Sequence, residues 1–343
     1  MAQKKNDNSE YRALRMALKD GAPECLYVFH GEEHFRMESA LKKLREQLTP
    51  DGLDTFNYHA FDGKNLDVRE LVETMDGLPM MSDRTLIVVT DFDLFGCNED
   101  SKTLLTQAFS DLPDYLCLVF VYDLLDYKIG RGKFQDLVKK VGHIVEFTAM
   151  EHNELIDWIY GRFLALDKQI TREECEYLIF LCGGLMTGLN GEIEKIAGYS
   201  KTSQITRTDI DAVADPVLEA QVFDMTGAIS ARDFSKALGC LADLYAANQH
   251  PIMILAVLGK HLRQLYTARL ALESGKGTPA LTEMWNMKSP WQANRLMSGA
   301  RNLTLDWCRK AVRLAAEADL DMKSSGRDAQ TILTELLLQL ANS

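Results

Sequence analysis

The residues best placed to do chemistry form a glycine turn between an apolar run and a helical pattern. The run Leu26–His30 ends at Gly31, and apolar residues then recur at helical spacing over 35–48. In nucleotide-binding domains such a turn presents backbone N–H groups to phosphates, within the spacing G-x-x-x-x-G-K-[ST]. The positions of the second glycine, the lysine and the hydroxyl are here Arg36, Met37 and Glu38. A methionine carries no charge for a phosphate and a glutamate repels one. The turn therefore predicts a nucleotide-binding fold whose degenerate phosphate loop binds no nucleotide.

No other cluster of residues predicts catalysis or a cofactor. The apolar run Leu86–Thr90 is followed by Asp91 and Asp93, which faintly resembles the magnesium-binding strand end of an ATPase, but the Asp-Glu pair that polarises water is absent. The seven cysteines contain no C-x-x-C and suggest buried, reduced thiols, and the histidines show no metal spacing. We expect no catalytic residue, no cofactor and no metal.

Composition and charge limit the partners. A chain of 343 residues is long enough for two or three domains, and it shows neither a membrane-spanning apolar run nor a secretory signal, so we expect a cytoplasmic protein with no membrane contact. Residues 213–343 hold 14 basic and 13 acidic residues, whereas the rest holds 24 and 37, a net charge of −13. An acidic front part disfavours a protein that wraps nucleic acid on its own, because phosphate contacts dominate that affinity. Only the last third is electrostatically suited to DNA.

The elements that must position these residues fall into three parts. Over 1–147, five strand patterns (26–30, 56–61, 85–90, 115–122 and 144–147) alternate with helical patterns (35–48, 68–75, 100–109 and 132–141). This alternation predicts an α/β domain with a five-stranded, mainly parallel sheet. Residues 148–214 read as a small helical lid, with helices at 151–166, 172–182, 188–199 and 208–214. Residues 215–343 read as an all-α domain of longer helices at 220–229, 231–246, 251–272, 279–285, 290–301, 305–323 and 329–340.

Several short stretches, in order along the chain, resemble the delta subunit family of bacterial DNA polymerase III, in the clamp-loader branch of the AAA+ proteins. They include Y-V-F-H-G-E-E-H-F at 27–35, F-N-Y with F-D-G at 56–63, L-P-M-M-S-D-R at 78–84, E-I-E-K-I at 192–196, V-F-D-M at 222–225, L-R-Q-L at 262–265 and A-D-L-D-M-K at 318–323. No single stretch is as specific as an ATPase motif, but the occurrence of all of them in this order along the chain is specific to the family.

The resemblance implies a role without enzymatic activity of its own. Family members bind and open the ring-shaped sliding clamp (the beta subunit) for loading onto primed DNA, while sister subunits bind ATP. The implied partners are therefore the clamp, the ATPase subunits (tau or gamma), delta-prime and primer-template DNA, with the C-terminal helices forming part of a collar. Enzyme classification as a nucleotidyltransferase would follow only from membership of the polymerase complex.

The family's clamp contact is a pair of large apolar residues, usually leucine then phenylalanine. Here the pair falls on Met80 and Met81, close to Leu78, so these three are the predicted clamp-binding residues. From the sequence alone, both methionines could instead be core residues entering the next strand. However, Asp76-Gly77 and Ser82-Asp83 around them favour a loop, and large apolar residues in a loop indicate a contact surface.

Two basic groups in the last third are candidates for DNA contact. Trp291 and Arg295 lie at the start of a predicted helix after Lys288, where the indole could stack on a base or simply pack between helices. Lys323 and Arg327 follow a long helix. Alternative functions are an AAA+ ATPase, or an ATPase-type clamp-loader subunit, with a divergent phosphate loop. A third is a DNA-binding regulator, which the acidic front part disfavours.

Overall fold

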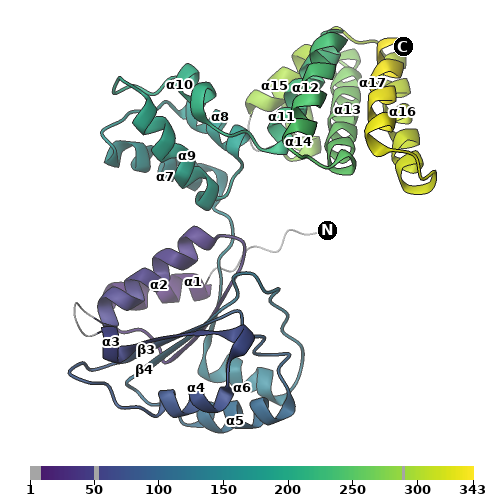
Figure 1. Ribbon diagram of the computed structural model, residues 1–343. Helices are drawn as coiled ribbons and strands as arrows, with labels where there is room; N and C mark the ends of the chain where they lie inside the picture. The colour runs from purple at the N-terminus through teal and green to yellow at the C-terminus, as the bar shows by residue number, and fades with distance from the viewer. Residues whose placement is uncertain (1–8, 50–53, 288–289) are drawn as a thin grey trace. The chain divides into compact units, whose positions relative to one another are not determined.

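The computed structural model describes residues 9–49, 54–287 and 290–343 (Figure 1). It divides into two compact units, one of residues 1–149 with 185–187 and the other of residues 150–184 with 188–343. The first boundary lies two residues from the predicted one, and the finer division at 214/215 stays a prediction. None of the described helices is long and apolar enough to span a membrane.

The first unit is built on a parallel sheet in the order β2-β3-β4-β1-β5. Its strands are β1 (Leu26–His30), β2 (Tyr58–Asp62), β3 (Thr85–Thr90), β4 (Leu116–Val121) and β5 (His143–Glu146). Its helices are α1 (Ser9–Asp20), α2 (His34–Leu48), α3 (Asp54–Asn57), α4 (Val68–Met75), α5 (Glu99–Ser110) and α6 (Lys133–Val141), with a 3₁₀ turn at Gly63–Asn65. The predicted α/β fold with five parallel strands is confirmed.

Helices cover both faces of this sheet, as its near-continuous apolar strands require. Figure 1 shows α1 and α2 on one face and α4, α5 and α6 on the other. Beneath α1 and α2 the strand residues Tyr27 and Phe29 pack with Leu14 and Leu44. One prediction was wrong in detail: residues 56 and 57 end the short helix α3, and the strand starts only at Tyr58.

The second unit is entirely helical, over its described residues, apart from an isolated bridge between Gln169 and Gln204. It begins with α7 (His152–Ala165), α8 (Arg172–Cys182), α9 (Met186–Tyr199) and α10 (Arg207–Val213). It continues with α11 (Leu218–Ser230), α12 (Phe234–Ala246), α13 (Pro251–Glu273), α14 (Thr278–Trp285), α15 (Pro290–Arg301), α16 (Leu305–Ser324) and α17 (Ala329–Ala341).

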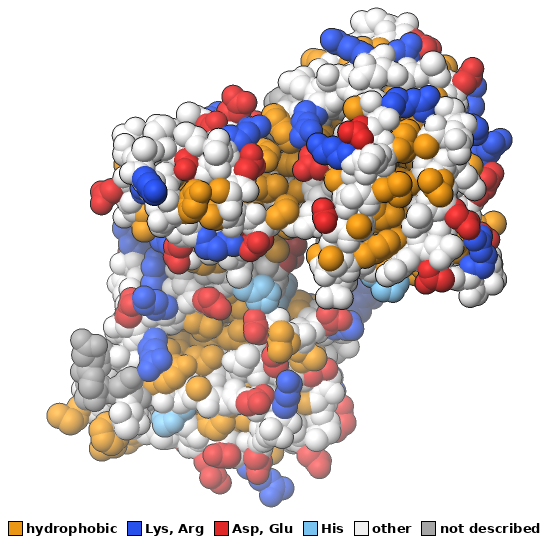
Figure 2. All heavy atoms as spheres, turned by 45° about the horizontal axis from the view of Figure 1, so that its top comes forward, with side chains coloured by type: hydrophobic (Ala, Val, Ile, Leu, Met, Phe, Trp, Pro, Cys, Tyr) orange, Lys and Arg blue, Asp and Glu red, His pale blue; other side chains and the backbone are white. Residues whose placement is uncertain are grey.

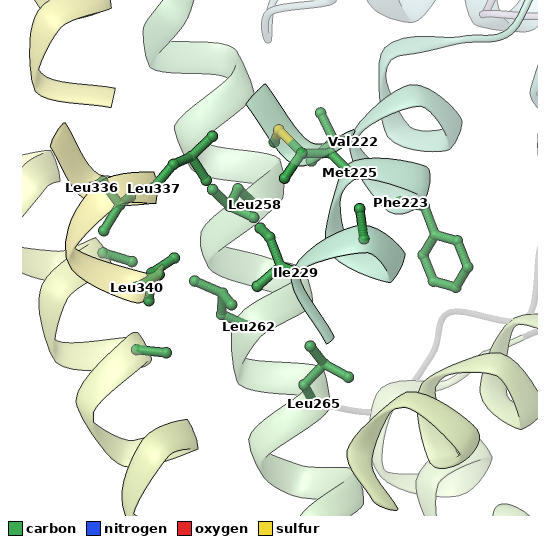
Figure 3. Close-up of a cluster of buried hydrophobic side chains, with 14 of the residues drawn as sticks. Val222, Phe223, Met225, Ile229, Leu258, Leu262, Leu265, Leu336, Leu337 and Leu340 are labelled. Atoms are coloured by element: carbon green, nitrogen blue, oxygen red, sulfur yellow. The ribbon is translucent and has the colours of Figure 1, made fainter. Parts of the chain in front are cut away.

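The core of the second unit gathers around α13. Figure 3 shows side chains of α11 and α17 around this helix, with Ile229 beside Leu258 and Leu262, and with Leu337 reaching toward it from α17. Phe223 lies at the edge of this cluster and packs edge-on against Phe180 of α8 at 5.1 Å between ring centroids. The α11–α17 helices thus share one core and are joined to α8 by aromatic packing.

Candidate protein-binding loop

The loop between α4 and β3 presents large apolar side chains to solvent. The exposed fractions of Leu78, Met80 and Met81 are 78%, 55% and 88%. Met75, the last residue of α4, and Leu86 of β3 are buried on either side. The three predicted contact residues therefore lie together on a surface loop, and the interpretation of Met80 and Met81 as core residues was wrong.

A buried amide fixes the backbone of this loop. Asn57, at the end of α3, is fully buried, and its Nδ2 donates to the carbonyl of Met80 at 2.8 Å. Its Oδ1 accepts from the N–H of the same residue at 2.7 Å. One side chain thus pairs with both polar groups of Met80, as a neighbouring strand would. The backbone is held while the thioether side chain stays in solvent.

The rest of the loop is also restrained. Met81 has a left-handed φ of +56°, which costs roughly 1–2 kcal/mol for a residue with a Cβ. The Ser82 hydroxyl donates to the carbonyl of Leu48 at 3.2 Å, and the Arg84 guanidinium donates to that of Leu116 at 2.8 Å. Backbone strain in an ordered loop is typical of functional sites. The loop therefore holds its exposed apolar side chains on a restrained backbone.

The sequence analysis did not single out Asn57, which holds the backbone of this loop. Phe56 beside it is 53% exposed, so the same short helix offers both the buried anchor and a further apolar side chain. The F-N-Y stretch has the pattern of a strand start and was predicted as one. An asparagine inside a supposed apolar strand was the available signal, because a buried amide needs hydrogen-bond partners.

The glycine turn after β1 packs against the backbone of Phe147. α2 begins at His34, only three residues after Gly31, so the predicted positions of the second glycine and lysine are already helical. A Cβ on Gly31 would lie 2.4 Å from the carbonyl oxygen of Phe147, and the Glu33 N–H donates to that same oxygen at 3.0 Å. The glycine accommodates a close backbone approach, and the Glu33 N–H of the turn is already bonded.

The side chains at the degenerate loop positions serve the fold. Met37 is buried in the core between α2 and the sheet. Arg36 lies over the ring of Tyr11 at 3.9 Å and donates to the carbonyl of Thr148 at 3.1 Å. Glu38 is exposed on α2. Neither Met37 nor Arg36 is placed as a phosphate ligand would be. Within the described residues, no cluster of His, Cys, Asp or Glu could hold a metal ion.

Trp291 lies in an aromatic cluster inside the second unit. Its ring is 4.8 Å from that of Phe180 and 5.4 Å from that of Tyr177, both on α8. The guanidinium of Arg295 lies 5.1 Å from the Trp291 ring centre, and Arg295 also pairs with Asp224 at 3.4 Å. These contacts favour the packing alternative, and the DNA contact stays a prediction. Lys288, the expected phosphate ligand beside Trp291, lies outside the described residues.

The second basic group is paired with carboxylates. Lys323 contacts Asp319 at 2.6 Å, while Arg327 contacts Asp321 at 3.0 Å and both carboxylate oxygens of Glu335 at 2.7 Å. These residues lie against α16 and α17, whereas Trp291 and Arg295 pack against α8 and α11. The structure does not bring the four predicted DNA residues into one cluster.

Comparisons with known proteins agree with this architecture. The family model of the DNA polymerase III delta subunit matches residues 27–148, and the model of the C-terminal domain of that delta subunit matches residues 219–340. The DNA polymerase III subunit delta of Bacillus subtilis is 25% identical over 335 residues, covering 94% of this chain and 95% of the relative. The probable DNA polymerase III subunit delta of Aquifex aeolicus is 23% identical over 275 residues, covering 78% and 77%.

A solved structure shows the same fold. The Bacillus subtilis DNA clamp loader delta protein superposes with a TM-score of 0.50 and 22% identity, over 97% of this chain and 99% of that one. The two family models match most of the first unit and the C-terminal part of the second, and the matches to the relative and to the solved structure cover nearly the whole chain. This chain belongs to the DNA polymerase III delta subunit family.

Proposed function

We propose that this chain is the member of the clamp loader that grips and opens the sliding clamp, with the loop of Leu78, Met80 and Met81 as the grip. The observation that carries the proposal is the exposure of these three apolar side chains on a loop whose backbone is fixed by Asn57. Preorganisation lowers the entropy that binding must overcome. Methionine is flexible and polarizable, so two of them can fill an apolar pocket on the clamp without an aromatic anchor.

Replacement of the methionine pair tests this proposal. Burying a methionine side chain contributes about 1.5–3 kcal/mol, so Met80→Ser with Met81→Ser should weaken clamp binding at least roughly a hundredfold. Met253→Ser with Met284→Ser removes two similarly exposed methionines from α13 and α14 and should leave clamp affinity unchanged. Met81→Phe should bind as well as the parent or better. Normal clamp capture by the first variant in a pull-down would place the grip elsewhere.

The chain performs this role without binding ATP. The bonded N–H of Glu33 and the burial of Met37 support this part of the proposal. Hydrolysis would then come from the ATPase subunits of the loader, and this chain would have no activity of its own. The same geometry disfavours the alternative of an ATPase with a divergent phosphate loop.

The second unit would hold the loader together through its C-terminal helices. Figure 2 shows apolar side chains reaching the surface over these helices, and Leu320 of α16 and Leu338 of α17 are 66% and 49% exposed. A groove of about 360 Å³ lies between these two helices. Assembly with tau or gamma and delta-prime should therefore be lost in Leu320→Ser with Leu338→Ser. An intact pentamer in size-exclusion chromatography would place the assembly surface elsewhere.

A further inference from the structure

A groove between α1 and α2 is not used by the proposed function. α1 is anchored on the first unit by the buried Leu14 and by Glu10, whose Oε2 lies 2.7 Å from Nδ1 of His143. The groove encloses about 850 Å³, a volume typical of ligand and peptide sites. Among the described residues its lining includes Arg12, Arg15, Met16, Leu18, Lys19 and Lys43.

The charge of this groove is opposite to that of its surroundings. Residues 1–149 hold 18 basic and 26 acidic residues, yet the described lining of the groove has four cations and no carboxylate. None of these four cations forms an ion pair within the described part of the chain. Of the carboxylates on α1 and α2, Glu46 pairs with Lys42 and Glu10 with His143, while Asp20 and Glu38 are not among the described lining residues. The groove therefore offers positive charge that nothing described in the chain neutralises.

The cations follow one face of α1. Arg12, Arg15 and Lys19 are spaced i, i+3 and i+7, which places them in a row about 10 Å long. Lys43 faces them from α2. Guanidinium groups bind carboxylates through paired hydrogen bonds, so this row matches two or three successive acidic side chains.

An apolar surface lies among these charges. Met16 is 56% exposed, and Leu18 closes the groove as part of the core beneath α1. Phosphate binding needs no apolar surface, and a long polyanion would extend from the groove onto the acidic remainder of the unit. A short peptide avoids that repulsion, and its apolar side chain can rest on the flexible thioether of Met16.

We infer that the α1–α2 groove binds a short acidic peptide segment of a partner protein, with carboxylates on Arg12, Arg15, Lys19 and Lys43 and a large apolar side chain on Met16. The peptide site does not include the loop of Leu78, Met80 and Met81. Variants with Met80→Ser and Met81→Ser should bind the peptide as the parent does.

A dye-labelled ten-residue peptide with five aspartates and two leucines serves as the probe in fluorescence-anisotropy titrations of the full chain. Arg15→Gln with Lys19→Gln should weaken binding roughly tenfold or more, since two charge-assisted contacts are lost. The matched control is Lys139→Gln with Lys140→Gln on α6, which removes equal charge from another exposed helix of the same unit. Met16→Ser should weaken binding several-fold, and Met16→Leu should retain it.

Three results would overturn the inference. The first is equal affinity for a peptide with asparagine in place of aspartate. The second is equal weakening by the α6 control, which would show attraction by net charge alone. The third is that a ten-nucleotide thymidine strand binds more tightly than the acidic peptide and that Arg15→Gln with Lys19→Gln abolishes this binding. That result would assign the site to nucleic acid. Thermal melting of each variant checks that the chain is folded.

Discussion

The double hydrogen bond from Asn57 to Met80 allows the role of loop preorganisation to be measured without touching an apolar contact residue. In Asn57→Ala both bonds, at 2.8 and 2.7 Å, are lost. Each is worth about 0.5–1.5 kcal/mol net, so the loop loses about 1–3 kcal/mol of restraint. If clamp binding needs the fixed loop, affinity should fall by up to a factor of roughly 5 to 150.

A second substitution at Asn57 sharpens this prediction. Asn57→Asp keeps an acceptor for the Met80 N–H, but it replaces the donor by a buried carboxylate oxygen that repels the Met80 carbonyl, so its clamp affinity should fall at least as far as that of Asn57→Ala. The control is Asn98→Ala, which removes the N-cap of α5, where Oδ1 accepts from Ser101 N at 2.8 Å. That change should lower stability by about 1 kcal/mol and leave clamp affinity unaltered.

Calorimetric titration of the clamp, with urea denaturation of each variant, separates affinity from stability. If Asn57→Ala bound the clamp with the affinity of the parent, clamp binding would not need a fixed loop backbone, and the prediction would be wrong. A loss of affinity in Asn98→Ala equal to that in Asn57→Ala would also refute it, since general destabilisation would explain both.

Three further predictions concern the rest of the chain. Calorimetry with magnesium-ATP should detect no heat from ATP binding. A micromolar affinity for ATP would contradict our interpretation of the turn at Gly31. Trp291→Ala should lower the free energy of unfolding, because it removes ring contacts with Tyr177 and Phe180. If the indole also stacks on a base, the assembled loader with Trp291→Phe, which keeps a packed ring, should bind primer-template DNA more weakly at unchanged melting temperature. Hydrogen bonds from His261 and Lys260 hold the pKa of Glu219 at about 2, below its ordinary value. The stability that Glu219 adds is therefore present above about pH 4.5 and lost as pH falls toward 2. Urea denaturation should show that the difference in free energy of unfolding between the parent and Glu219→Gln decreases between these two pH values.

The sequence by itself determined the order of elements and the type of fold. Continuous apolar runs such as Leu26–His30 and Leu86–Thr90 have to be buried on both faces, and helical repeats between them supply the cover, so a parallel sheet follows. The loop character of residues 76–84 was equally local, because Gly77, Pro79 and Ser82 disfavour helix and strand alike.

Tertiary structure decided what that loop and the turn after β1 can do. Asn57 pairs with Met80 across 23 residues of sequence, and Gly31 is required by the backbone of Phe147, more than a hundred residues away. The charge of Arg327 looked available in the sequence, but folding places Glu335 of α17 beside it, whereas Lys323 pairs with Asp319 one turn away within α16. The cations of α1 line a groove only because α2 packs beside that helix. Hydrophobic periodicity acts over a few residues, so it fixes elements, whereas hydrogen bonds and ion pairs between distant residues depend on how those elements pack.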